Sequence, residues 1–144
     1  MKMPSFTVQI PNLLAVGPVV EIQISAGQAF VTAHKRKAAA ISTPLRVSAM
    51  VDTGASASVI QEGLAAQLGL TPVGAILIHT ASSTNVRCYE YEVQLVFPNE
   101  VVVAATAIEA PLQGQAIQCL IGRDVLSHGV LIYNGVSNLF KLSF

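Results

Sequence analysis

Apolar and polar residues alternate with a period of two along much of this chain, and this pattern predicts a domain built mainly of β-strands. The clearest case is the stretch 20–24, where three aliphatic residues alternate with Glu21 and Gln23. Asn134 and Gly135, between two further apolar stretches, are typical of a hairpin turn. The other predicted strands are 30–32, 45–51, 76–80, 86–97, 101–108, 117–121, 130–133 and 136–144.

Helical spacing of apolar residues is much rarer than alternation. It predicts one helix at 59–70, which Gly69 and Pro72 would end, and a second, short helix at 123–128. The basic stretch 34–37 is interpreted as a solvated turn, since its charges are too few for a nucleic-acid footprint. We therefore expect an all-β domain with one or two short helices.

The composition suggests one domain that associates with another subunit. A chain of 144 residues can bury a sizeable core without disulfides. Charged residues make up only 11% of it, against about 25% in an average soluble domain, and 52% of the residues are hydrophobic. So few charges cannot coat a monomer generously, which predicts that a second subunit covers some apolar surface. The zero net charge argues against nucleic acid or an anionic membrane as a partner.

Cysteine and histidine give no sign of metal or redox chemistry. Cys88 and Cys119 lie in apolar, strand-like stretches and are expected to be buried free thiols. The three histidines lack the spacing of metal ligands, so we expect neither a metal nor another cofactor. No apolar run is long enough to span a bilayer, and prolines interrupt the start of the chain, which makes a poor secretory signal. These features predict a cytoplasmic location.

The strongest chemical signal is Asp52-Thr53-Gly54, directly after the apolar stretch 45–51. The chain has only two aspartates, and a strand that delivers one of them into a tight turn presents it at the edge of a core. That position is costly for a carboxylate unless hydrogen bonds satisfy it or it carries out chemistry. A given tripeptide also arises by chance, so the motif needs support from its context.

That context is a second motif further along the chain. Residues 51–56 read Val-Asp-Thr-Gly-Ala-Ser, residues 119–126 read Cys-Leu-Ile-Gly-Arg-Asp-Val-Leu, and a predicted hairpin with a small, polar tip lies between them. In this order the features resemble the retropepsin-like aspartic proteases over roughly 45–144. The resemblance implies a single-lobe, closed β-barrel whose active site forms only when two lobes meet at a two-fold axis. It implies a homodimeric endopeptidase that acts on a peptide or protein substrate without a cofactor.

The resemblance also implies roles for individual residues. Two Asp52 side chains a few ångströms apart would share one proton and activate a water between them. Thr53 would hydrogen-bond to the opposite loop, Gly54 would let the backbone approach the substrate, and loop 81–85 would be the tip of a flap over an extended peptide. The predicted substrate-binding residues come from the two motifs and the flap: Met50, Ala55, Ser56, Ala81, Ser82, Ser83 and Leu120.

In the second motif, Gly122 would provide packing room. Asp124 is interpreted as a helix N-terminal residue favoured by the helix dipole, and not as a second catalytic acid. Retroviral members usually carry an aspartate at the position of Ser56, which pairs with the arginine of the second motif. Arg123 therefore needs another partner: Asp124, Glu62 or a main-chain carbonyl.

Several alternatives stay open at this point. Met50 and Leu120 can also be read as ordinary core residues. The tip 81–85 lacks the glycines of retroviral flaps, which favours a second hypothesis, a retropepsin-fold dimerisation or binding module with little peptidase activity. An unrelated β-barrel with a chance motif is a third. We assign 19–144 to the protease domain and 1–18 to an N-terminal arm or pro-segment.

Overall fold

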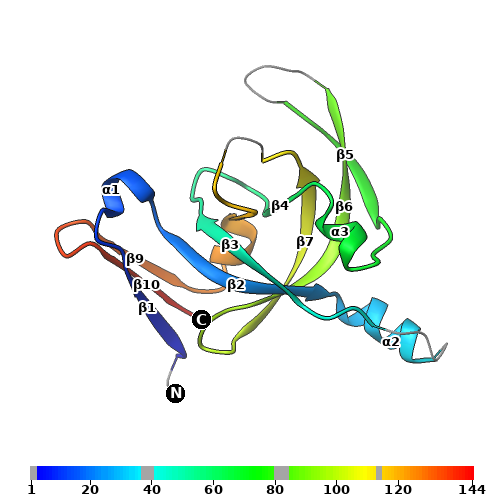
Figure 1. Cartoon of the computed structure of the whole chain (residues 1–144), viewed down its shortest axis with the longest axis horizontal. Helices are drawn as coiled ribbons and strands as arrows, with labels where there is room; N and C mark the ends of the chain where they lie inside the picture. The colour runs from blue at the N-terminus through cyan, green and yellow to red at the C-terminus, as the bar shows by residue number, and fades with distance from the viewer. Residues whose placement is uncertain (1–2, 37–40, 80–84, 113–114) are drawn as a thin grey trace.

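The computed structural model describes residues 3–36, 41–79, 85–112 and 115–144. Within these ranges six strands form a closed barrel in the order β2, β3, β8, β4, β7 and β6, because β6 pairs back onto β2 (Figure 1). These strands are β2 (Val19–Ala26), β3 (Leu45–Val51), β4 (Val59–Gln61), β6 (Val86–Val96), β7 (Val102–Ala110) and β8 (Cys119–Ile121). The prediction of a mostly β, closed barrel with short helices is confirmed.

A seventh strand, β5 (Gly74–Ile78), pairs with the first part of β6 and lies outside the closed ring. Figure 1 shows this β5–β6 hairpin projecting beyond the barrel. Its apolar residues are more exposed than those of the barrel, and Leu77 keeps 58% of its surface in solvent. The hairpin is therefore a separate arm on the barrel.

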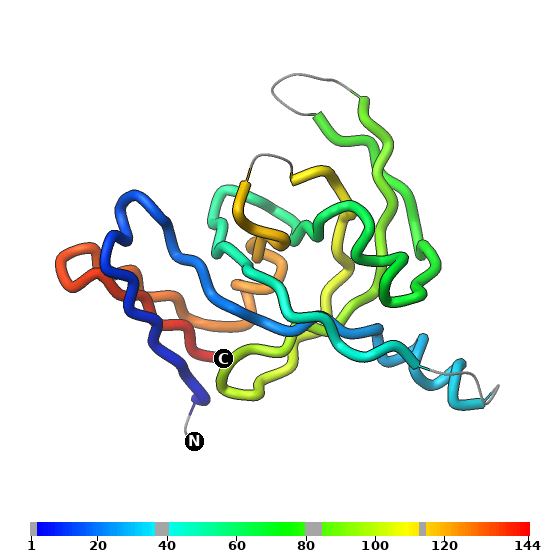
Figure 2. The backbone as a smooth tube through the Cα atoms, viewed as in Figure 1, coloured from blue at the N-terminus to red at the C-terminus, as the bar shows by residue number. Residues whose placement is uncertain are grey.

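A second, three-stranded sheet brings the two ends of the described chain together. β1 (Ser5–Gln9) and β9 (Val130–Asn134) pair antiparallel with opposite edges of β10 (Leu139–Ser143). Figure 2 shows this sheet beside the barrel. Phe140 and Leu142 of β10 are fully buried in the same apolar cluster as the barrel residues, so the two sheets share one core.

The helices of the described residues are short connections around these sheets. They are α1 (Leu13–Val16), α2 (Gln28–Arg36), α3 (Leu64–Gln67) and α4 (Arg123–Leu126). None of them has the length and apolar character that a membrane crossing requires. Four helices thus stand where the sequence predicted one or two.

The predicted helix at 59–70 is wrong over its first part. Its β-branched residues Val59 and Ile60 belong to β4, which pairs parallel with β7 and antiparallel with β8. Ile60 is fully buried between them, and such burial outweighs weak helical spacing. The helix itself is the single turn α3, which follows Gly63 (φ 97°) and ends before Gly69 (φ 66°), as predicted for its end.

The predicted strand at 30–32 is also wrong, because these residues lie in the helix α2. The Phe30 ring stacks on the His34 ring one turn later, with centroids 3.7 Å apart, and the His34 Nδ1–H donates to the Phe30 carbonyl (3.1 Å). The predicted solvated turn at 34–37 is instead the last turn of this helix up to Arg36, whereas Lys37 lies outside the described residues.

The hairpin at Asn134 and Gly135 is confirmed, but its loop is longer than the sequence predicted. Asn134 pairs with Leu139, so four residues connect the strands and β10 begins at Leu139 and not at 136. The Asn134 side-chain oxygen accepts a hydrogen bond from the Ser137 N–H (3.0 Å), which closes this wider turn. The strand at 45–51 has the predicted bounds, and that at 86–97 ends one residue early.

Candidate active site

Asp52 lies where two parallel strands of the barrel end together. β3 and β8 pair in parallel, which places Met50 opposite Leu120 and Val51 opposite Ile121. The Asp52 N–H then continues the ladder by donating to the Ile121 carbonyl (2.9 Å). The first predicted motif is therefore bonded directly to the second, and the acid is delivered at the shared edge of both.

The turn after Asp52 holds its carboxylate but leaves it open. The Gly54 N–H donates to Asp52 Oδ1 (2.9 Å), and the Ala55 N–H donates to the Asp52 carbonyl (3.3 Å). A Cβ at position 54 would lie 3.1 Å from that carboxylate oxygen, so glycine fits this close approach best. Within the described residues Gly54 is the one donor to the carboxylate. The half-buried Asp52 can therefore accept or donate further hydrogen bonds.

The remaining residues of the first motif lie on the surface of the same turn. Thr53 and Ser56 are exposed, and Ala55 is half-buried. The structure thus brings Asp52, Thr53 and Gly54 together with two of the predicted substrate-binding residues.

The second motif supports this turn through a network of hydrogen bonds that the sequence did not predict. The carboxylate of Asp124 accepts from the Ser58 Oγ–H (2.8 Å), the Ser58 N–H (3.0 Å) and its neighbour's backbone, the Val125 N–H (2.9 Å). The Gly122 N–H in turn donates to Ser58 Oγ (3.0 Å). Ser58 is 1% exposed, so this serine satisfies a buried junction between the two motifs.

Gly122 is confirmed as the residue that gives this junction its room. A Cβ there would lie 2.6 Å from the backbone carbonyl carbon of Ala57, a distance that real Cβ atoms do not show. Asp124 lies in the first turn of α4, as predicted, and its carboxylate also has a second role. Its bonds to Ser58 cross the junction, 66 residues apart in sequence.

Arg123 finds one of its three predicted partners. Its Nη1–H donates to the Thr53 carbonyl (2.8 Å), and its backbone N–H donates to the Ala55 carbonyl (2.9 Å). The main-chain carbonyl, and not Asp124 or Glu62, is therefore its partner. Arg123 thus connects the Thr53 and Ala55 carbonyls, in the turn after Asp52, to the start of α4.

An apolar pocket of about 400 Å³ lies against the second half of β3. Ser48 and Met50 line it, and the alternation of β3 places Asp52 on the same side as these two residues. Met50 is half-buried there, as is Leu120 on the neighbouring strand. The other lining residues were not predicted and come from α1, β2 and the segment before β8: Val16, Val19, Gln115, Ala116 and Ile117.

The predicted flap tip cannot be placed. β5 and β6 form the expected hairpin, with Ile78 opposite Val86, but Ala81, Ser82 and Ser83 lie outside the described residues. Asn85, the first described residue after this loop, has a left-handed φ of 57°.

Other reactive groups do not gather at this site. Cys88 and Cys119 are buried free thiols, as predicted, and burial, with a smaller contribution from Asp124, raises the pKa of Cys119 to about 12. A thiol that stays neutral at ordinary pH is a poor nucleophile. In the part of the chain that the structure describes, no three His, Cys, Asp or Glu side chains gather as a metal site would need.

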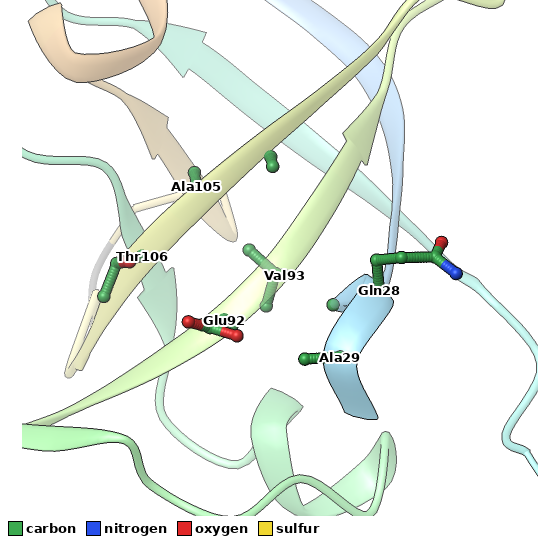
Figure 3. Close-up of a pocket in the computed structure, with 8 residues that line it drawn as sticks. Gln28, Ala29, Glu92, Val93, Ala105 and Thr106 are labelled. Atoms are coloured by element: carbon green, nitrogen blue, oxygen red, sulfur yellow. The ribbon is translucent and has the colours of Figure 1, made fainter. Parts of the chain in front are cut away.

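A second pocket, of about 290 Å³, lies between the start of α2 and strands β6 and β7 (Figure 3). Because β2 and β3 run antiparallel, with Ile24 opposite Leu45 and Val19 opposite Met50, it lies at the far end of that ladder from the acid. Its one ionisable lining residue is Glu92. A lone exposed carboxylate is an ordinary surface feature, so this pocket is separate from the candidate site.

Comparisons with known proteins agree with this geometry. The family model described as gag-polyprotein putative aspartyl protease matches residues 38–128, which include both motifs. The crystal structure of a retropepsin-like aspartic protease from Rickettsia conorii has the same fold: the TM-score is 0.59 at 14% identity, over 99% of this chain and 93% of that one. No curated protein sequence matches. The chain therefore belongs to the retropepsin-like aspartic protease family.

Proposed function

We propose that this protein is an aspartic endopeptidase that works as a homodimer and hydrolyses peptide bonds with a water held between two Asp52 carboxylates. One chain supplies one such acid, so a second copy must supply the other. Two carboxylates a few ångströms apart cannot both stay ionised, so they share one proton. The charged member then removes a proton from the water while the protonated member donates to the scissile carbonyl.

The observation that carries this proposal is the way Asp52 is held. Its backbone is locked to β8 through Ile121, and its carboxylate receives one local hydrogen bond, from Gly54, among the described residues. The acid is thus fixed in place with capacity left for a water, a substrate and a second acid. A rigid mount with an open carboxylate is what acid–base catalysis needs.

The surroundings fit an extended peptide as the substrate. The β5–β6 hairpin would cover the peptide with strand-like main-chain hydrogen bonds, as the resemblance implied for the flap. The apolar pocket that contains Met50 would take a side chain of the substrate. Thr53, exposed in the single chain, would bond to the turn of the second copy and hold the two acids together.

A peptide library tests the proposal directly. Wild-type protein, Asp52→Asn and Glu92→Gln are incubated with mixed peptides between pH 4 and 8, and cleavage is read by mass spectrometry. Glu92→Gln is the matched control, since it neutralises an acid in the other pocket. Cleavage by the wild type and the control, but not by Asp52→Asn, would support the proposal. A folded, dimeric wild type that cleaves nothing would overturn it and favour a dimerisation or binding module.

A further inference from the structure

The β5–β6 hairpin has an open sheet edge along β5. β5 is the last strand of the seven-stranded sheet, and within the described residues it pairs with β6 alone. Its five residues, 74–78, include neither a charged residue nor a proline. Proteins usually protect such an edge with a charge, a proline or a covering element. The edge of β5 therefore offers backbone N–H and carbonyl groups to a further strand.

The two faces of this hairpin have different surroundings. On the inner face, Ile78 and Val86 stand opposite each other and pack against the small apolar cluster that Ala57, in the segment after the acid, also contacts. Side chains alternate between the faces of a strand, so Leu77 and Arg87, which also stand opposite each other, lie on the outer face. The outer face is therefore separate from the cluster beside the acid.

The outer face exposes apolar side chains. Leu77 keeps 58% of its surface in solvent and Tyr89 keeps 45%, and Val73, just before β5, keeps 55%. Ala75 stands opposite Tyr89 and is also exposed. Apolar residues gathered in this way on a projecting hairpin mark an interaction surface (Figure 1).

A hollow of about 300 Å³ is lined by Arg87 and by three successive residues of β5: Ala75, Ile76 and Leu77. Successive side chains point to opposite faces, so a hollow that touches all three reaches around the open edge of β5. The Arg87 guanidinium lies 5.5 Å from the centre of the Tyr89 ring. Because Tyr89 stands opposite Ala75, only a small side chain separates this cation from the open edge.

Arg87 is the one ionisable residue that lines the hollow. Among the described residues the one ion pair joins Arg46 to Glu21, so no carboxylate neutralises Arg87 there. Glu90, the next acid along β6, stands opposite Gly74 on the inner face. The charge of Arg87 therefore favours an acidic partner on the outer face.

We propose that the open edge and outer face of β5 bind an extended segment of a partner protein, in which an acidic and an aliphatic residue are two positions apart. The segment would add to β5 as a further strand through main-chain hydrogen bonds. Its acidic side chain would pass over Ala75 to Arg87, and its aliphatic side chain would pack beside Leu77. Residues two apart share one face of a strand, so one segment can make both contacts. This binding does not require that the protein cleaves peptides.

Fluorescence anisotropy with two labelled peptides tests the charge preference. The first is a threonine-rich peptide that carries one glutamate with an isoleucine two positions away on each side, and the second has lysine in place of the glutamate. We expect the glutamate peptide to bind at least about fivefold more tightly, and Arg87→Glu to reverse this preference. Equal binding of the two peptides by the wild type, or no binding of either, would overturn the proposal.

A matched pair of substitutions tests the apolar contact. Leu77→Thr removes the exposed aliphatic side chain but keeps a strand-forming residue, and Val136→Thr does the same at a 96% exposed residue outside the hairpin. We expect Leu77→Thr to weaken binding of the glutamate peptide about fivefold or more and Val136→Thr less than about twofold. Circular dichroism checks that both variants fold. Equal effects of the two substitutions would contradict the proposed contact.

Nuclear magnetic resonance and analytical ultracentrifugation identify other occupants of the edge. Addition of the glutamate peptide should shift the amide signals of residues 73–78, whereas shifts confined to 52–56 would mean that the peptide binds as a substrate. A change of oligomeric state in Leu77→Thr without peptide would assign the edge to a second copy. Either result would overturn the proposal.

The outcomes separate this inference from the proposed function. Peptide binding is measured with the wild type and with Asp52→Asn, because the docking does not depend on the acid. A protein that binds the glutamate peptide through β5 but cleaves nothing refutes the endopeptidase and supports the docking surface. An active enzyme that binds neither peptide supports the endopeptidase and refutes the docking surface.

Discussion

Asp52 and Asp124 are the only aspartates of the chain, and both follow a strand of the same parallel pair, β3 and β8. Both are half-buried. The Asp124 carboxylate accepts two hydrogen bonds from Ser58 and one from Val125, whereas the Asp52 carboxylate receives one bond, from Gly54, among the described residues. Two acids of the same type, each following one strand of the same parallel pair, are thus held in opposite ways.

The difference separates a structural acid from a chemical one. A carboxylate whose oxygens are already bonded to several local donors has little capacity left for a substrate. A carboxylate whose backbone is fixed but whose oxygens are open keeps that capacity. Asp124 therefore supports the junction of the two motifs, and Asp52 is the acid that this junction presents.

The largest expected effect comes from replacing Asp52, the acid whose oxygens are open. Asp52→Asn keeps the size of the side chain and its bond from Gly54, but an amide cannot take a proton from water. We expect peptide cleavage to fall about 10³-fold or more, while the free energy of unfolding changes by less than about 1 kcal/mol. Cleavage rates and urea unfolding of the same preparations check both parts. An unfolded variant, or one that still cleaves at the wild-type rate, would contradict the assignment.

Replacing Asp124, the acid that supports the junction, should mainly lower the free energy of unfolding. Asp124→Ala leaves the buried N–H and hydroxyl of Ser58 without their partner, and we expect it to cost roughly 2–4 kcal/mol of unfolding free energy. Asp124→Asn retains one acceptor oxygen and should cost less. Urea unfolding measures both variants. Equal stability of Asp124→Ala and wild type would show that the network contributes nothing, and the distinction between the two acids would fail.

The junction between the two motifs can also be disturbed by adding a side chain at Gly122. Gly122→Ala places a Cβ against the Ala57 backbone, and we expect a loss of roughly 1–3 kcal/mol, because backbone and not a flexible side chain must move. Gly135→Ala is the matched control. Its Cβ would lie 3.6 Å from the Tyr133 ring, an ordinary contact, so its effect should stay within about 0.5 kcal/mol. Thermal unfolding of both variants checks the prediction, and equal losses in Gly122→Ala and Gly135→Ala would contradict it.

Much of the barrel and of the acid's position follows from local pattern. The strand at 45–51 is a continuous apolar-rich stretch that ends in Asp52, and the sequence predicted its bounds correctly. The order of the two motifs indicated the family, and the structure bonds them to each other through Asp52 and Ile121. These features could be predicted because period and turn residues are local properties of the chain, and the order of the two motifs is read directly along it.

Other features could not be predicted, because they depend on distant partners. β4 is a three-residue strand whose identity comes from pairing with β7 and β8, and its residues Val59 and Ile60 mimic helical spacing. In α2, residues 30–32 are of strand-forming types but lie in a helix, where the Phe30 ring stacks on the His34 ring one turn later. Ser58 reads as one more small polar residue after the turn, and its role is visible only when Asp124 lies beside it. The one available signal was that Asp124 is the chain's only other aspartate.

The smallest expected effect concerns Arg123, which connects the helix of the second motif to the turn of the first. Its guanidinium is exposed and bonds to the Thr53 carbonyl, so Arg123→Ala should cost only about 0.5–1 kcal/mol of stability. If it positions the turn of Asp52, kcat for peptide cleavage should fall several-fold while KM stays the same. Arg46→Ala is the control, since it breaks an exposed ion pair with Glu21 that does not touch that turn. A loss of kcat in Arg46→Ala as large as in Arg123→Ala would show that the arginine acts through general charge and not through Thr53.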